Sequence, residues 1–377
     1  MSRIEAFHSS AAAWLTEHTP ERPVMFFEPG ILQATAARFL KGFPGMVTYA
    51  VKANPAPGVL DNLLAAGVTG FDVASPDEMA LVRDRAPEAA LHYHNPVRTR
   101  AEIAAGLDAG VTSWSVDRHG ELEKLSGLPK GSEVAVRLKL EVAGAAYDFG
   151  AKFGAGPERA ADLLRRVVKM GFTPSLTFHP GTQCDSAMPW RRYIQAAAEV
   201  AQTAGVSLHR LNVGGGFAAR RGAAVPDLEG VFAAIAEEVA ARFGADAPAL
   251  VCEPGRGMVA ECMTLALQVK AVEEEVIFLN DGLYGSLAEW RDIAASDRVS
   301  VVSPEGLQRE AAVRRRVAFG PTCDSLDVLP EPLPLPADLA EGDYLLFAGM
   351  GAYSGALATG FNGYGMARTV TLGPTGQ

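Results

Sequence analysis

The chain has 377 residues, 48% of them hydrophobic, so it is long enough for two domains and apolar enough to bury a large core. Its formal net charge of −10 and isoelectric point near 5.3 argue against a nucleic-acid-binding surface. The four cysteines form no CxxC pair and lack metal-ligand spacing, so we expect free thiols in a reducing compartment and no metal site.

Neither the N-terminus nor the longest uncharged stretch predicts a membrane or export signal. The N-terminus carries Glu5, Glu17 and Glu21 and lacks an apolar run, so we expect a cytoplasmic protein with no secretory signal. Residues 345–367 carry no charge but are broken by six glycines, which makes them too weakly apolar for a membrane span. A buried, glycine-rich segment near a ligand is the expectation there.

Short β-rich runs alternate with alanine-rich helical segments, a pattern typical of a parallel sheet built from βαβ units. Several of the helical segments end at glycine, as the segment 57–67 does. This alternation predicts a closed β/α barrel over residues 28–262, with a doubly wound open sheet as the alternative because strand number does not prove closure. The eight runs are residues 46–52, 70–75, 90–95, 112–117, 133–140, 174–180, 209–215 and 249–255.

After residue 262 the alternation stops. Residues 264–281, 313–322 and 342–349 each read as a longer strand, and a proline-rich connection, 329–339, separates the last two. Another strand, within residues 22–30, precedes the barrel. We therefore predict a second, mainly antiparallel β domain built from both chain ends, residues 1–27 and 263–377.

The stretch "YAVKAN", residues 49–54, places Lys52 at the end of an apolar run. A buried lysine is costly unless it loses its charge or forms a covalent bond, as Schiff-base lysines do. The alternative is a lysine at a strand end that extends its ammonium to water. The stretch alone does not decide between them.

Polar residues gather at the carboxyl ends of the eight runs, the end at which β/α barrels build their active sites. We expect these side chains to meet at one mouth of the barrel. They are Lys52, Asp72, Ser75, His92, Asn95, Asp117, Arg137, His179, Asn212, Glu253 and Arg256.

Two of these ends predict a phosphate site. "NVGGGF" places Gly214–Gly216 after the seventh run, and "EPGRG" places Arg256 after the eighth. The loops after strands seven and eight commonly bind phosphate in such barrels, although turn glycines beside a surface arginine are the simpler alternative. A phosphate site and a Schiff-base lysine together suggest pyridoxal phosphate, with Glu253 on its pyridine nitrogen and His179 on its ring face.

With these motifs together, the chain resembles the fold-type III pyridoxal-phosphate amino-acid decarboxylases of the ornithine/lysine decarboxylase group. The resemblance extends from about residue 47 to residue 365. The matching stretches are "YAVKANP", "FDVAS", "KFG", "FHPGTQ", "NVGGGF", "EPGRGMV", "LNDGLYGS", "GPTCDSLDVL" and "GAYSGALATGFNGYG".

The resemblance implies roles for individual residues. Lys52 would hold the cofactor as a Schiff base, and Cys323 would return a proton to the substrate carbon after carbon dioxide leaves. Glu253 and His179 would complete the catalytic set. The implied cofactor contacts are Lys52, Asp72, Arg137, His179, Thr182, Gly214, Gly215, Gly216, Glu253, Gly255, Arg256 and Tyr353. The implied substrate contacts are Tyr284, Asp292, Asp324 and Phe361, with the "CDS" segment supplied by the second subunit of a homodimer.

The implied reaction is decarboxylation of a basic L-amino acid in polyamine biosynthesis, with ornithine to putrescine first and lysine to cadaverine second. The pattern departs from the family near residue 292, where Asp292 and Glu289 compete as the acid for the distal amine. If Arg291 faces the pocket, diaminopimelate or carboxynorspermidine becomes the alternative substrate. A partner-binding relative without activity would be expected to lose Lys52, the phosphate loop or Cys323, and all three are present.

Overall fold

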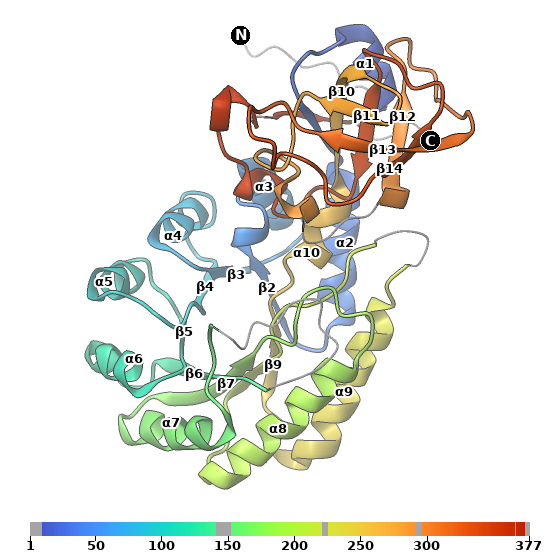
Figure 1. Cartoon of the computed structure of the whole chain (residues 1–377). Coiled ribbons are helices and arrows are strands. Elements are labelled where there is room, and N and C mark those ends of the chain that lie inside the picture. The colour runs from blue at the N-terminus through green and yellow to red at the C-terminus, as the bar shows by residue number, and fades with distance from the viewer. Residues whose placement is uncertain (1–9, 141–151, 221–224, 292–295, 366, 374–377) are drawn as a thin grey trace. The chain divides into compact units, whose positions relative to one another are not determined.

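The computed structural model of the chain describes residues 10–140, 152–220, 225–291, 296–365 and 367–373 (Figure 1). The chain divides into two compact units, and each is described by itself. The barrel unit comprises Ala34–Ala218 and Pro226–Met258, and the sheet unit comprises Met1–Gln33, Ala219–Val225 and Val259–Gln377. Among the described residues, no helix combines the length and the hydropathy that a bilayer span requires.

Eight parallel strands close into a barrel, which confirms the predicted fold class and excludes the open sheet. Closure comes from the pairing of the first and last strands, in which Met46 lies opposite Val251 and Val47 opposite Cys252. The strands are β2 (Met46–Ala50), β3 (Gly70–Val73), β4 (Ala90–Tyr93), β5 (Ser113–Val116), β6 (Glu133–Leu138), β7 (Thr173–Phe178), β8 (Arg210–Asn212) and β9 (Ala249–Cys252).

Helices follow the barrel strands and lie around the outside of the barrel (Figure 1). α7 shows why they pack there, because its Ala160, Leu163, Leu164 and Val167 recur at helical spacing and are all buried. These helices are α3 (Pro57–Ala65), α4 (Pro76–Arg83), α5 (Arg100–Asp108), α6 (His119–Lys124), α7 (Pro157–Lys169), α8 (Met188–Ala204) and α9 (Leu228–Phe243). Two more helices flank the barrel strands along the chain, α2 (Pro29–Gly42) before β2 and the short α10 (Arg256–Val259) after β9.

The sheet unit contains an eight-stranded sheet in which most neighbouring strands are antiparallel. β1 pairs with β10 and with β16, so strands from both ends of the chain lie side by side. α1 (Ala11–His18) and α11 (Ser354–Leu357) belong to the same unit. The strands are β1 (Val24–Phe27), β10 (Met263–Val272), β11 (Val276–Leu279), β12 (Val299–Val302), β13 (Val313–Phe319), β14 (Leu333–Pro336), β15 (Tyr344–Ala348) and β16 (Arg368–Thr371).

One core joins the two chain ends in the sheet unit. Trp14 and Leu15 of α1 pack with Phe26 of β1, Tyr344 of β15 and Val370 of β16, and all five are buried. Fully burying a side chain of this size contributes about 1.5–3 kcal/mol. The N-terminal helix and the last strand are therefore held by the same apolar cluster.

Two expectations for the sheet unit are wrong. Residues 264–281 form two antiparallel strands, β10 and β11, because three consecutive glutamates, Glu273–Glu275, occupy the turn between them. The proline-rich stretch expected as a connection contains strand β14, which pairs with β13. β14 is the last strand in the sheet order, and an edge strand tolerates Pro334 and Pro336 because one of its sides needs no ladder hydrogen bond.

Candidate active site

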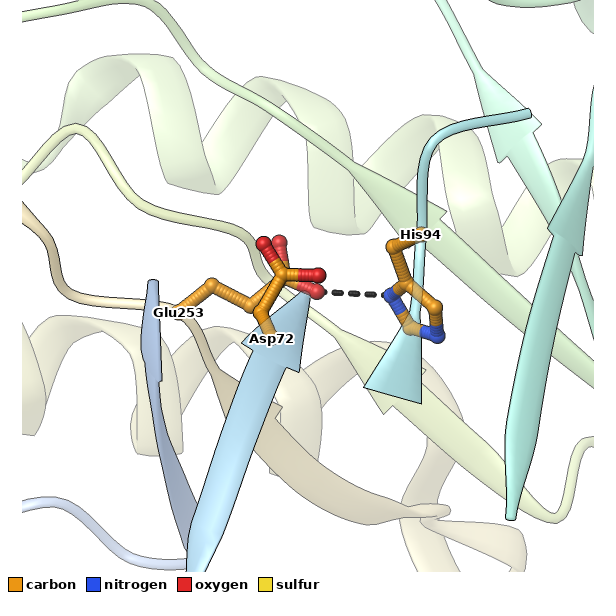
Figure 2. Close-up of side chains that lie close together, drawn as sticks. All are labelled: Asp72, His94 and Glu253. Atoms are coloured by element: carbon orange, nitrogen blue, oxygen red, sulfur yellow. Dashed lines mark hydrogen bonds and ion pairs between the residues drawn. The ribbon is translucent and has the colours of Figure 1, made fainter. Parts of the chain in front are cut away.

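Three titratable side chains meet at the carboxyl ends of three barrel strands (Figure 2). Asp72 is the third of the four residues of β3, Glu253 directly follows β9, and His94 directly follows β4. A carboxylate oxygen of each acid and a ring nitrogen of His94 all lie within 4.8 Å of one another, and all three residues are largely buried. The expected convergence at the barrel mouth therefore holds for Asp72 and Glu253.

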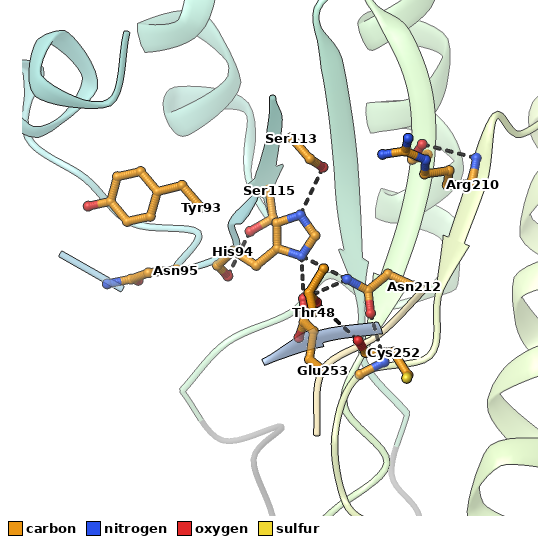
Figure 3. A network of polar contacts seen from close by, with 12 residues as sticks. Thr48, Tyr93, His94, Asn95, Ser113, Ser115, Arg210, Asn212, Cys252 and Glu253 are labelled. Carbon is orange, nitrogen blue, oxygen red and sulfur yellow. Dashed lines mark hydrogen bonds and ion pairs between the residues drawn. The ribbon is translucent and has the colours of Figure 1, made fainter. Parts of the chain in front are cut away.

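Glu253 is held by two nitrogen donors (Figure 3). His94 Nδ1 lies 2.6 Å and Asn212 Nδ2 lies 2.5 Å from the same oxygen, Oε1. The Asn212 amide has only one suitable orientation, because its Oδ1 accepts the Gly214 N–H at 2.9 Å. The glutamate side chain is thus held by residues at the carboxyl ends of β4 and β8.

The pKa values of the two buried acids are shifted in opposite directions. Burial raises the pKa of Asp72, and the charge on Glu253 raises it further, to about 7. Burial also works against ionisation of Glu253, but His94, Lys52 and the Asn212 hydrogen bond outweigh it and hold the pKa of Glu253 below its usual range. The site therefore keeps one carboxylate ionised and leaves the other easily protonated near neutral pH.

Lys52 follows β2 in a short 3₁₀ turn, Val51–Ala53, and its side chain is exposed. The expectation that Lys52 is buried is wrong, because the strand ends at Ala50, before the lysine. The charge on Lys52 nevertheless acts on the barrel mouth. It partly offsets the rise that burial causes in the pKa of Asp72 and of Glu78.

The three glycines after β8 form a loop with no room for side chains. A Cβ on Gly215 would lie 2.8 Å from the carbonyl oxygen of Glu253 and 3.1 Å from Nε2 of His179. A Cβ on Gly216 would lie 2.9 Å from the carbonyl oxygen of Gly181, and Gly214 and Gly216 both have positive φ. These positions therefore require glycine, and they leave bare backbone beside His179 and Glu253.

His179 follows β7 and is kept neutral. Burial, and then the charges on Lys52 and Arg137, lower its pKa to about 3. The backbone N–H of Gly181 donates to Nδ1 at 3.3 Å, which leaves the ring proton on Nε2. A neutral, half-buried ring beside the glycine loop has the properties expected of a residue that stacks on a cofactor.

The remaining predicted cofactor residues of the barrel unit lie in β6 or in the turns after β7 and β9. Arg137 of β6 is half-buried, with its guanidinium 5.4 Å from the Phe153 ring centre, and its charge acts on Glu253 and Asp72. Arg256 begins α10 and is 8% exposed. Thr182 is half-buried, and Gly255 is buried directly before Arg256.

Other strand-end residues have local roles in the loops and helix ends around them. Ser75 caps α4 by accepting the Glu78 N–H, and Asp117 accepts the N–H of Gly154. Asn95 accepts the N–H of Val97, two residues along its own loop. These three side chains are thus used to shape the loops around the mouth.

In the sheet unit, the predicted substrate residues form a second group. The Tyr284 hydroxyl donates to Asp324 Oδ2 at 2.6 Å, and the rings of Tyr284 and Phe361 lie 5.1 Å apart. Cys323 is exposed, and its backbone N–H donates to Asn362 Oδ1 at 3.1 Å. An acid, a thiol and two aromatic rings are therefore presented together.

Three further positions complete the predicted set. Tyr353 precedes α11 with a left-handed φ of 62° and is half-buried. Asp292 lies outside the described residues. Its competitor Glu289 is buried, whereas Arg291 is exposed.

Sequence reasoning missed His94 and Glu78. The prediction selected His92, but side chains alternate along a strand, so a residue two positions later shares its side. That alternation was the available signal for His94. Glu78 is the third residue of α4, and the charge on Lys52 partly offsets the rise that burial causes in the pKa of its carboxyl group.

Comparison with known proteins assigns the family. A family model described as "Pyridoxal-dependent decarboxylase, pyridoxal binding domain" matches residues 30–260. The chain belongs to the pyridoxal-dependent decarboxylases. This confirms the resemblance drawn from the motifs, and it makes the protein an enzyme whose cofactor is pyridoxal phosphate.

Individual relatives of this decarboxylase family cover most of the chain. "Decarboxylase flvG" of Aspergillus flavus is 31% identical over 84% of this chain and 77% of its own length. "Lysine/ornithine decarboxylase" of Selenomonas ruminantium is 30% identical over 86% of this chain and 82% of its own. The solved structure of lysine/ornithine decarboxylase from Vibrio vulnificus, complexed with putrescine, has a TM-score of 0.83 at 27% identity and covers 97% of this chain and 99% of that one.

The barrel mouth fits this cofactor on structural grounds. Within the described part of the chain, the buried Asp72 Oδ1 has no hydrogen-bond partner, so a polar group is missing beside it. The glycine loop presents bare backbone beside His179 and Glu253, and the ionised Glu253 is the partner that a protonated ring nitrogen requires. The charge on Lys52 acts on both acids.

Proposed function

We propose that this decarboxylase acts on a basic L-amino acid, with ornithine converted to putrescine as the first choice and lysine to cadaverine as the second. The observation that carries the proposal is the buried, doubly hydrogen-bonded Glu253 in the same barrel mouth as Lys52. The printed names of the relatives from Selenomonas ruminantium and Vibrio vulnificus support a basic substrate.

The barrel residues would bind the cofactor and keep its ring protonated. When bound, pyridoxal phosphate supplies an electron-accepting ring that takes up the charge released as carbon dioxide leaves. Lys52 would hold it covalently, and Gly214–Gly216 with Arg256 would bind its phosphate. Glu253 would keep a proton on the ring nitrogen, and the neutral His179 would support the ring face.

The sheet-unit residues would act on the substrate. The Cys323 thiol would return a proton to the carbon that lost carbon dioxide, and Asp324 would bind the distal amine. Tyr284 supports that role because its hydroxyl bonds one oxygen of Asp324 and fixes the carboxylate. Phe361 is exposed beside Tyr284, which suits an interface, so we propose a homodimer in which these residues complete the partner's site.

The choice of substrate depends on the charges near the distal end. A distal amine favours a carboxylate partner such as Asp324, Asp292 or the buried Glu289. A distal amino acid would also need a cation for its carboxylate, and Arg291 would have to supply it. Because Arg291 is exposed, we place diaminopimelate and carboxynorspermidine behind ornithine and lysine.

A substrate panel tests this proposal. The purified protein with pyridoxal phosphate would receive ornithine, lysine, arginine, diaminopimelate and carboxynorspermidine, with carbon dioxide release measured and products identified by mass. We expect putrescine from ornithine, and no turnover by K52A. Release from diaminopimelate alone would contradict the basic-substrate proposal, and full activity of K52A would contradict the role of Lys52.

The pathway and compartment follow from the same proposal. Putrescine and cadaverine are polyamines, so we place the enzyme in polyamine biosynthesis. Four free cysteines, three of them buried, support a reducing cytoplasm. Retention of activity in a strongly reducing buffer, with four thiols titratable after unfolding, is the matching measurement.

A further inference from the structure

Asp72 and Glu253 form a buried acid pair in the barrel mouth. Their oxygens lie within 4.8 Å of each other and of a ring nitrogen of His94, and both residues are at most 9% exposed. Two carboxylates so close in a low-dielectric site resist double ionisation, so one of them keeps a proton more readily than the other. Which of the two keeps it decides how the site can pair with a cationic ring.

The hydrogen bonds around the pair are unequal. Glu253 Oε1 accepts from His94 and from Asn212, whereas among the described residues Asp72 Oδ1 has no partner. A carboxylate with donors on it is stabilised in its ionised form, and one without donors is not. The surroundings therefore favour the charge on Glu253.

His94 is oriented so that its Nδ1 carries the proton. Asn212 points its amide nitrogen at the same carboxylate oxygen and lies 3.0 Å from Nδ1. The Gly214 N–H fixes the Asn212 amide, so that its Nδ2 faces Glu253 Oε1 as a donor. Asn212 Nδ2 and His94 Nδ1 therefore both donate to the same carboxylate oxygen. Ser113 Oγ lies 2.9 Å from Nε2 and holds the other side of the ring.

We propose that His94 is a positioning residue that assigns the single negative charge of the Asp72–Glu253 pair to Glu253. The consequence for the cofactor rests on the proposed function, since it requires Glu253 to pair with the ring nitrogen. The charge assignment itself belongs to the protein and is measurable without the cofactor.

Several other charged or titratable groups act on the pair or on His94. They differ from His94 because, among the described contacts, none of them donates a hydrogen bond to Glu253. The charge on Glu253 raises the pKa of His94, although burial opposes this. The groups are Lys52 after β2, Glu78 of α4, His92 of β4, Glu133 and Arg137 of β6, His179 after β7 and Arg210 of β8.

The first test follows the His94 ring by NMR in the full chain stripped of cofactor, with its signal assigned by its loss in H94N. We expect His94 to stay protonated to higher pH than an ordinary histidine, and its midpoint to fall in E253Q. The matched control is E133Q. Glu133 is another buried acid whose charge acts on His94, but its hydrogen bonds are to Ser175 and Arg210. Equal midpoints in E253Q and in the unchanged protein would overturn the proposal.

The second test uses the cofactor-loaded enzyme and measures pyridoxal phosphate affinity and the pH dependence of its visible absorbance. A hydrogen bond to a charged group contributes about 1.5–3 kcal/mol, so H94A should bind cofactor at least about tenfold more weakly. H94N keeps an N–H donor near Glu253 and should recover part of the loss. The control is H92A, which removes the neighbouring ring, 5.3 Å away, without removing a bond to Glu253.

The outcomes separate the two proposals. If H94A and H92A bind cofactor equally well and show the same pH dependence, the positioning role is wrong. If the unchanged protein takes up no pyridoxal phosphate, the proposed function fails, while the His94 titration still decides where the charge lies. If H94A does not fold, H94N and E253Q carry the test.

Discussion

Replacing Gly214 with alanine tests whether the loop after β8 must be bare backbone. Gly214 has a φ of +68°, and its Cβ would overlap the carbonyl oxygen of Phe178 and lie 3.1 Å from Cα of His179. The left-handed backbone costs a non-glycine residue about 1–2 kcal/mol, and overpacking adds about 1–3 kcal/mol. We therefore expect G214A to lose about 2–5 kcal/mol of stability and, because His179 must shift, to bind pyridoxal phosphate poorly.

Gly205 provides a matched control for the backbone cost. It follows α8 with a φ of +67°, and a Cβ there would have no atom within 4 Å. G205A should therefore lose only the stability that the left-handed backbone costs, which lowers its melting temperature by a few degrees. It should bind cofactor normally. Thermal unfolding and equilibrium dialysis with pyridoxal phosphate measure both effects. If G214A melts and binds cofactor as G205A does, the requirement for bare backbone at the loop is refuted.

Three further variants address the proton donor, the substrate acid and the buried acid. C323A should slow formation of the amine about 10²–10⁴-fold, with the cofactor absorbance unchanged, and normal product formation would contradict a proton-donor role. D324N should lower kcat/KM for ornithine about 10–100-fold without weakening cofactor binding, and an unchanged KM would exclude it from the amine site. Because the pKa of Asp72 is raised to about 7 in the folded protein, stability contributed by its protonated form is lost as pH rises from 4 to 7. D72N should therefore match the cofactor-free wild type near pH 4 and melt higher than it at pH 8, whereas a difference that does not vary with pH would contradict the raised pKa.

The barrel was predictable because its signals are local. Each strand is a short buried run, and each outer helix carries apolar residues at helical spacing, as Leu163, Leu164 and Val167 do in α7. The sheet unit was harder to predict. The run 264–281 has strand-like composition throughout, so the turn at Glu273–Glu275 became clear only from the β10–β11 pairing. The β14 edge strand was hidden by prolines that usually indicate a connection.

The site was predictable where glycine spacing or a strand end fixed the position. Gly214–Gly216, Asp72 and Glu253 came from those signals, and the structure places all of them at the barrel mouth. The alternation after His92 indicated the side on which His94 lies, but not its importance, which comes from a hydrogen bond to a residue 159 positions away. The exposure of Lys52 was left open by the sequence, because the apolar run continues two residues beyond the end of the strand.

Borohydride reduction of the purified, cofactor-loaded protein, followed by mass spectrometry of its peptides, tests the central claim most directly. If the amine of Lys52 and the glycine loop serve one pyridoxal phosphate site, the visible absorbance band disappears on reduction. The reduced cofactor is then found on the peptide that contains Lys52 and is absent from K52A. Label on another lysine, or no incorporation by a protein that still folds, would contradict the account.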